Sequence, residues 1–256
     1  MSNDHLILPR FLLKRFEIPE KPGLIWRLDI GKKKIGPPIP WSSANTSPDY
    51  YSAGNEARFC KLELLFSRLC KMATVINNNP ESDDVIINQI KAKEFIKDWV
   101  LADAGRMRFN MNTKTTDDEE YNYRERNAVI SDVCKCELPK SASDFIDNSC
   151  VVLLRNSTSV DFVLGSCHRI EGGLEGCATV IFPISPKLAL CFVDKKWIRN
   201  KAVDLKENEI VIWNYDNQDH ILGINKYVLE GVQRADLNEI YSCSKNELER
   251  LLDNLV

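Results

Sequence analysis

The apolar pattern changes its period part-way along this chain of 256 residues. Between about residues 55 and 109, apolar side chains recur at three- and four-residue steps, which indicate helices with one buried face. After about residue 149 they form short, nearly continuous runs, which are typical of buried strands. Helices and strands that are grouped in this way favour the α+β class. We therefore expect an antiparallel or mixed β-sheet packed against two long helices, with N-terminal and C-terminal helices docked on the core.

We expect residues 1–256 to form a single α+β domain with three parts. Residues 1–52 would carry an N-terminal helix and a hairpin, residues 53–148 the helical half, and residues 149–256 a strand-rich half with C-terminal helices. Apolar residues close to the N-terminus share one helical face: Leu8, Phe11, Leu12 and Phe16. Pro9 suits the first turn of this helix, because its missing N–H would have no partner there. So short a helix is not stable alone, and we expect it to dock on the core.

The helical half predicts two long helices, from residue 55 to about 78 and from 85 to about 109. The loop between them is short, which favours antiparallel packing. The polar, acidic segment 113–126 is typical of a solvated loop. Two short helices separated at Pro139 are expected between residues 129 and 146.

Alternating and continuous apolar runs predict strands at 24–30, 150–155, 160–165, 178–182, 188–193 and 239–243. We expect the first to pair across a lysine-rich turn, the second with the third, and the fourth with the fifth. Segment 171–176 is expected to be a loop.

Two helices are predicted after the last apolar strand pair. Segment 208–229 suits a helix, although its residues 211–213 also suit a strand. Residues 245–255 predict a terminal helix, with Ser244 as N-cap and Glu247 as its capping-box partner.

The charges nearly balance, with 34 basic and 37 acidic residues and a formal net charge of -3. This balance gives no overall attraction to nucleic acid or anionic membranes, although it is consistent with a local basic patch. We expect no membrane span and no signal peptide, because neither pattern is present. The nine cysteines are odd in number and lack a Cys-x-x-Cys pair, which favours reduced thiols in a cytoplasmic protein over a zinc site.

Several weak motifs follow one another in order: Pro9-Arg10-Phe11, a tryptophan-bearing hairpin, a helix with two glutamates, an arginine-ended helix, and Phe182-Pro183-Ile184-Ser185-Pro186. This order resembles the domain-of-unknown-function family 4238, whose hallmark is an N-terminal His-Tyr-Val-Pro segment. The family histidine corresponds to Leu6 here, with His5 one residue earlier. The family's Thr-Ser-Asp-x-Pro turn looks like Gly165-Ser166-Cys167-His168-Arg169, without the aspartate and the proline. The resemblance brings no known activity, and the missing residues imply an inactive or differently equipped member.

The resemblance singles out Glu56, Glu63 and Arg106, and the helix spacing supports this choice. Seven residues separate the two glutamates, so they share one helical face. Antiparallel helices would bring Arg106 near one of them. The structural interpretation is an ion pair that fixes the helix register. The functional interpretation is a polar pocket in which the carboxylates bind a metal or act as a base.

The chain has three histidines, namely His5, His168 and His220. His5 would complete a His/Glu/Glu/Arg set suited to phosphodiester chemistry, or would simply cap the first helix. His168 follows an expected strand end, but it cannot form a dyad with Cys167 merely by adjacency, because neighbours in an extended chain point apart. The candidate catalytic residues are therefore His5, Glu56, Glu63, Arg106 and His168; no cofactor is indicated, and the metal dependence is open.

Two non-catalytic functions are also consistent with the sequence. A nucleic-acid module would use basic residues with aromatic residues for stacking. The basic candidates are Arg10, Lys14, Arg15, Lys32, Lys33, Lys34, Arg106 and Arg108, and the aromatic candidates are Trp26, Trp41, Tyr50 and Tyr51. A protein-interaction subunit or regulator of a toxin or defence complex is the other alternative. Our leading expectation is a bacterial stress or phage-defence component, nuclease-like, acting on or near nucleic acid, with a nucleic-acid or protein partner and an oligomeric state that the sequence leaves open.

Overall fold

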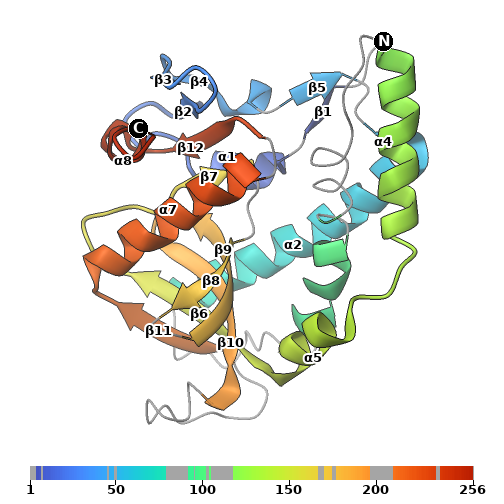
Figure 1. The fold of residues 1–256 in the computed structure, drawn as a ribbon. Coiled ribbons are helices and arrows are strands. Elements are labelled where there is room, and N and C mark those ends of the chain that lie inside the picture. Colours follow the sequence, from blue (N-terminus) through green and yellow to red (C-terminus); the bar gives the residue numbers. More distant parts are fainter. Residues whose placement is uncertain are drawn as a thin grey trace.

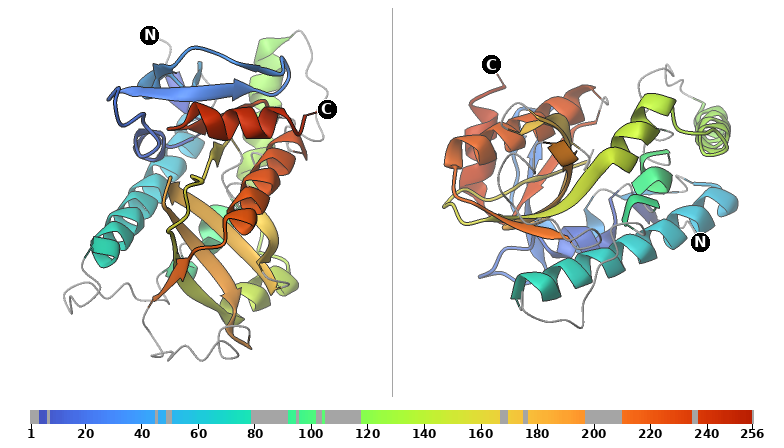
Figure 2. Two further views of the ribbon diagram at one scale, coloured as in Figure 1. Left: turned by 90° about the vertical axis from the view of Figure 1, so that its left-hand side faces the viewer. Right: turned by 90° about the horizontal axis from the view of Figure 1, so that it is seen from below.

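The fold is α+β, as the sequence predicted (Figure 1). The computed structural model describes residues 4–6, 8–44, 46–48, 51–78, 92–94, 96–101, 104, 118–166, 170–174, 177–196, 210–234 and 237–255. Strands gather into one large sheet, a second sheet above it and a small two-stranded sheet, and helices cover the large sheet on both sides (Figures 1 and 2).

The large sheet has the strand order β11-β6-β10-β9-β8. Neighbouring strands run antiparallel, except that β11 is parallel to β6. The strands are β6 (Ser149–Asn156), β8 (Ile170–Leu174), β9 (Cys177–Ser185), β10 (Leu188–Asp194) and β11 (Val211–Tyr215). The expected pairing of β9 with β10 is confirmed, and β10 lies at the centre, as its continuous apolar run indicated.

The second sheet has the order β3-β2-β12-β7, and β4 also pairs with β2. Its strands are β2 (Leu24–Asp29), β3 (Lys34–Ile35), β4 (Ile39–Pro40), β7 (Leu164–Gly165) and β12 (Glu239–Ser242). The predicted lysine-rich hairpin is confirmed, and Lys33 adopts a positive φ of 47° in its turn. A 3-10 turn, η1 (Trp41–Ser43), follows β4. The small sheet pairs β1 (Asp4–Leu6) with β5 (Thr46–Pro48).

The helices lie on both sides of the large sheet and beside the second sheet (Figures 1 and 2). They are α1 (Arg10–Lys14), α2 (Ala53–Asn78), α4 (Glu119–Val133), α5 (Lys140–Asn148), α7 (Gln218–Arg234) and α8 (Lys245–Leu252). Residues 92–94 and 96–101 are helical too, within the second predicted long helix. α7 covers one face of the large sheet, and α2 covers the other (Figure 2).

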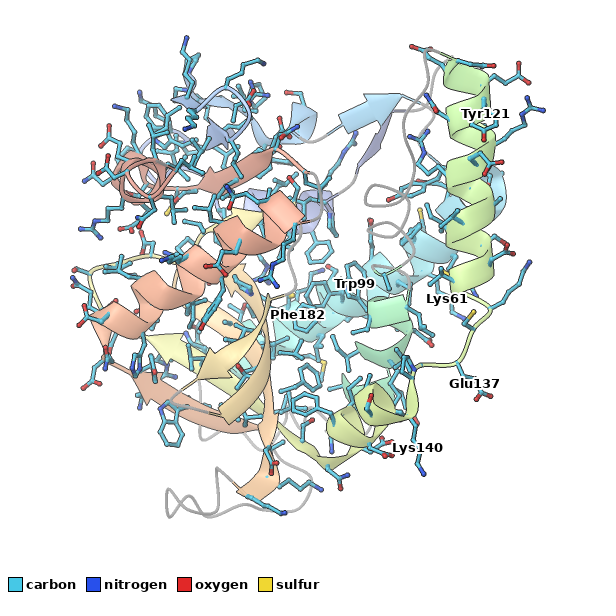
Figure 3. All side chains as sticks on the ribbon, viewed as in Figure 1. Lys61, Trp99, Tyr121, Glu137, Lys140 and Phe182 are labelled. Carbon is cyan, nitrogen blue, oxygen red and sulfur yellow. The ribbon has the colours of Figure 1, made fainter. Side chains whose placement is uncertain are left out.

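Phe66 on α2 lies at the centre of the interface between helices and sheet. Its ring centroid is 5.8 Å from Phe11 of α1, 5.1 Å from Trp99 and 6.1 Å from Phe182 of β9. Trp99 and Phe182 both lie inside the molecule in Figure 3. Buried hydrophobic residues from the N-terminal, helical and strand-rich parts belong to one cluster. The helical half and the strand-rich half therefore share an interior.

The predicted docking of the N-terminal helix is confirmed. Leu8, Leu12 and Phe16 are fully buried and belong to the same cluster. Pro9 occupies the N-cap position of α1, and its carbonyl oxygen accepts the backbone N–H groups of Leu12 and Leu13. Packing against the core therefore stabilises this helix, because a helix this short is not stable on its own.

The predicted hairpin between 150–155 and 160–165 is wrong. β6 pairs with β10 and β11 instead, and β7 pairs with β12 in the second sheet. Asn156 turns the chain, because its side chain accepts the N–H of Thr158 and donates to the carbonyl of Val160. The chain that follows passes from one sheet to the other. Val160 and Val163 are therefore buried, although neither belongs to a strand.

The predicted loop at 113–126 is wrong from residue 119 onward, where α4 begins; residues 113–117 lie outside the described residues. Asp118 is the N-cap, and its Oδ1 accepts the backbone N–H of Tyr121 at 3.0 Å. Glu119 and Glu120 follow in the first turn, where negative charge stabilises a helix. The acidic run therefore starts a helix rather than a loop. The break at Pro139 is confirmed, since Pro139 is the N-cap position of α5.

Three further predictions need correction or refinement. The expected loop at 171–176 contains strand β8, and the expected helix at 208–229 divides into strand β11 and helix α7, as the alternative for 211–213 allowed. Ser244 occupies the N-cap position of α8, but its side chain makes no cap hydrogen bond. Glu247 pairs instead with Arg250, so the predicted capping box is absent.

Within the described residues, no helix is both long enough and apolar enough to cross a membrane.

Candidate functional site

Glu56 and Glu63 lie on one face of α2, on either side of Cys60. The Cys60 thiol donates to Oε1 of Glu56 at 3.5 Å. Partial burial raises the pKa of this thiol, and the negative charges of Glu56 and Glu63 raise it further. The seven-residue spacing therefore does bring the two carboxylates to the same stretch of helix surface. The raised pKa keeps the Cys60 thiol protonated at neutral pH, which makes Cys60 a poor nucleophile.

The other predicted catalytic residues cannot be placed beside these glutamates. His5 lies in β1, where its backbone is opposite Ser47, so the interpretation of His5 as a cap of the first helix is wrong. Its side chain, Arg106 and His168 lie outside the described residues. The composite His/Glu/Glu/Arg site stays a prediction. Among the side chains that the structure describes, no three His, Cys, Asp or Glu residues gather closely enough to hold a metal ion.

His220 is the histidine whose surroundings the structure describes. Its Nδ1 shares a hydrogen bond with the Tyr215 hydroxyl, and the two rings stack with centroids 5.7 Å apart. Its backbone N–H donates to Oδ1 of Asn217 at 3.2 Å. These contacts join the end of β11 to the first turn of α7 and have a clear structural role.

The strongest surface feature is the outward side of α2. The helix forms one edge of the molecule (Figure 2, right). Its residues Phe59, Leu62 and Phe66 are buried in the core. Four basic residues are exposed on its other side, and we call them the basic face of α2: Arg58, Lys61, Arg68 and Lys71. Lys61 is labelled beside the C-terminal end of α4 in Figure 3.

The basic face carries charge of one sign. The only acidic residues of α2 are Glu56 and Glu63, and both are half-buried on the side of Cys60. Arg58 donates to the carbonyl of Cys134 at the end of α4. Lys61, Arg68 and Lys71 form no ion pair within the described part of the chain, so their positive charges face solvent. Beside them on the helix, Leu64 is 54% exposed and Val75 is 45% exposed.

The basic surface that the sequence predicted consists of other residues than the basic face of α2. Several of these residues contact other parts of the protein instead of forming one surface. Arg15 donates to Oγ1 of Thr74 at 2.9 Å, and Lys32 pairs with Asp29 at 3.0 Å. Lys14 lies over the Trp41 ring, 6.0 Å from its centroid. Arg106 and Arg108 lie outside the described residues.

The proposed stacking residues are only partly available. Tyr51 is buried, and its ring lies 4.6 Å from that of Phe59, so its role as a stacking platform is wrong. Trp26 and Trp41 are half-buried against the core. Tyr50 lies outside the described residues.

The basic face of α2 has a signal in the sequence, which lies in the helical period. Once the buried face of α2 is assigned to Phe59, Leu62 and Phe66, the positions on the opposite side follow from the 3.6-residue period. All charged residues at those positions are Lys or Arg. The charge of the helix surface, rather than clusters in the linear sequence, indicates the site.

Comparisons of this chain with protein-family models, with curated proteins and with solved structures found no match. The resemblance to the domain-of-unknown-function family 4238 stays a prediction.

Proposed function

We propose that this protein binds the phosphate backbone of nucleic acid on the basic face of α2. The observation that carries the proposal is the exposure of Arg58, Lys61, Arg68 and Lys71 on one helix, whose two acidic residues, Glu56 and Glu63, are half-buried on the side of Cys60. Exposed cations whose charge is not neutralised by a carboxylate attract polyanions and release the counterions that surround them. A local surface of this kind stands out because the whole chain carries a net charge of -3.

The geometry supports contact with several phosphates. Thirteen residues separate Arg58 from Lys71, which corresponds to about 20 Å along the helix axis. Contacts to phosphate position a protein but carry no sequence information. The exposed neighbours of these cations on α2 include Leu64 and Val75, which are apolar and cannot form hydrogen bonds with base edges. The proposed binding is therefore independent of base sequence.

The test is fluorescence anisotropy of labelled DNA and RNA, single-stranded and duplex, titrated with the full chain. The variant Lys61→Glu/Arg68→Glu reverses two charges at the centre of the basic face. We expect it to bind at least about tenfold more weakly at low salt, because each lost phosphate contact removes counterion release. Both side chains are exposed, so the melting temperature should stay the same.

The matched control is Lys33→Glu/Lys34→Glu, at the end of the β2–β3 turn and the start of β3. It changes the net charge by the same amount, and both residues are exposed. We expect it to bind like the unaltered protein. Equal weakening in both variants would show that overall charge, not α2, governs binding. No binding of any nucleic acid by the unaltered chain would overturn the proposal.

If the protein also cleaves the nucleic acid that it binds, it needs the predicted composite His/Glu/Glu/Arg site. A nuclease-like hydrolase in a stress or phage-defence system would require His5 and Arg106 to reach Glu56 and Glu63. Half-burial of the two glutamates beside a basic surface supports this extension, because a scissile phosphate held on α2 would lie near carboxylates. Nuclease activity that survives in both Glu63→Gln and His5→Ala would contradict it.

A protein partner is the second candidate, and the exposed leucine and valine favour it. A helix with acidic and apolar residues would contact the cations together with Leu64 and Val75. The variant Leu64→Gln separates the two candidates. It would weaken a protein complex by removing apolar contact, whereas nucleic-acid binding through phosphates should not change.

A further inference from the structure

A cavity lies between helices α7 and α8, away from α2. Its volume is about 530 Å³, within the range of about 300–1,000 Å³ that is usual for small-molecule sites. The two helices pack on the same side of the molecule (Figure 2, left). Apolar and charged groups share its wall, which includes Leu222, Gly223, Lys226, Arg250, Leu251 and Asp253.

The buried polar groups of the cavity are already used within the protein. Glu247 is 4% exposed, and both of its carboxylate oxygens accept from NH1 of Arg250, at 3.2 and 3.3 Å. The amide of Asn225 donates to the carbonyl of Asp161 at 2.7 Å and accepts the N–H of Val163 at 3.1 Å. These contacts hold the walls of the cavity in place.

The charged groups of Lys226 and Asp253, and the part of the Arg250 guanidinium that does not contact Glu247, are available to a ligand. The Arg250 side chain is 47% exposed, and within the described residues only its NH1 has a bonding partner. Lys226 and Asp253 are exposed at the cavity and form no ion pair with another described residue. The cavity therefore offers two cationic groups and one anionic group beside the side chains of Leu222 and Leu251.

Gly223 keeps the wall of α7 open. It lies inside the helix, where glycine is less favourable than alanine. A Cβ at this position would meet no atom within 4 Å, so no packing within the described chain requires a glycine. Gly231 lies in the same helix with the same freedom, but it does not line the cavity.

We propose that this cavity binds a free α-amino acid with an aliphatic side chain. The carboxylate of the ligand lies against Arg250 and Lys226, and its ammonium group lies against Asp253. Its side chain packs on Leu222 and Leu251 in the space that Gly223 leaves. A zwitterion fits because the groups left for a ligand carry both signs of charge. A simple anion would meet repulsion from Asp253, and a simple cation would meet repulsion from Lys226.

The test is isothermal titration of the full chain with L-leucine and L-methionine. Three probes remove one part of the ligand each: 4-methylpentanoate lacks the ammonium group, 3-methylbutylamine lacks the carboxylate, and glycine lacks the side chain. We expect saturable binding of the two amino acids in the micromolar to millimolar range, and at least tenfold weaker binding of each probe. No binding of any aliphatic amino acid at millimolar concentration would overturn the proposal.

A pair of glycine variants tests the position of the site. Gly223→Leu fills the cavity and should abolish binding, whereas Gly231→Leu should bind as the unaltered chain does. Both substitutions place leucine in open space on one helix, so they should change the melting temperature alike. Equal affinity in both variants would contradict the proposed site. Neither variant touches α2, so this result is independent of nucleic-acid binding.

Discussion

Asn225 on α7 completes the hydrogen bonding of a chain segment that leaves the large sheet. Its Oδ1 accepts the backbone N–H of Val163 at 3.1 Å, and its Nδ2 donates to the carbonyl of Asp161 at 2.7 Å. A primary amide has the same donor and acceptor as a peptide group, so Asn225 replaces the strand that this segment lacks. The residue is 2% exposed, and water cannot take over its role.

Asn225→Ala should therefore destabilise the protein strongly. Two buried backbone groups would lose their partners, and we expect the free energy of unfolding to fall by about 2–4 kcal/mol. Urea denaturation followed by circular dichroism measures this change. Asn254→Ala is the control, because Asn254 is exposed and its side-chain amide donates to the carbonyl of Arg250 in an exposed hydrogen bond; it should change stability by less than about 0.5 kcal/mol. Similar losses in both variants would contradict the role of Asn225.

Glu247 should make stability depend on pH in a defined direction. Burial raises its pKa above the usual 4.5, although Arg250 acts in the opposite direction. The folded state then binds the proton more tightly than the unfolded state, so this residue lowers stability as pH rises from the unfolded pKa through the folded one. Glu247→Gln removes this dependence. Relative to the unaltered protein, the variant should gain stability as pH rises through that window, in paired urea titrations. A difference that does not change with pH would contradict this account.

Cys60 should react slowly with iodoacetamide for an exposed thiol. Burial and the charges of Glu56 and Glu63 raise its pKa above 9.0, which reduces the thiolate fraction at neutral pH. The variant Glu56→Gln/Glu63→Gln removes both charges, and the midpoint of its rate–pH profile at Cys60 should move to lower pH. Mass spectrometry of the Cys60 peptide gives the rate. An unchanged midpoint would show that the carboxylates do not flank the thiol.

The elements that the sequence predicted correctly are those with strong local patterns. The apolar spacing of Leu8, Leu12 and Phe16 indicates the buried face of α1 and its flanking residues, and the continuous apolar run of β10 indicates a central strand. Pro139 marks the start of α5, because proline is tolerated at a helix N-terminus, where its missing N–H would have no helical partner.

The errors have causes that are distant in sequence. The segment after Asn156 reads as a hairpin strand, but Asn225, more than sixty residues later, provides its hydrogen bonds. The acidic run reads as a loop, but Asp118 caps a helix whose Asn127 bonds to Asn55 of α2. A pattern search within one segment cannot find partners of this kind, because the fold brings them together.

The features of the candidate sites also differ in whether a local sequence pattern predicts them. The shared face of Glu56 and Glu63 follows from helix periodicity, and the structure places both beside Cys60. The basic face of α2 also follows from that periodicity, but only after the buried face is known. The cavity at Gly223 depends on the packing of α8 against α7, which no local pattern predicts.

The most direct test of nucleic-acid binding by α2 is its dependence on salt. If the four cations of the basic face each neutralise one phosphate, the slope of log K against log salt concentration should be about -3.6 for duplex DNA and about -2.8 for single strands. Removal of two contacts in Lys61→Glu/Arg68→Glu should reduce the slope to about half or less. Identical slopes for this variant and the unaltered protein, or a slope near zero for both, would contradict the account.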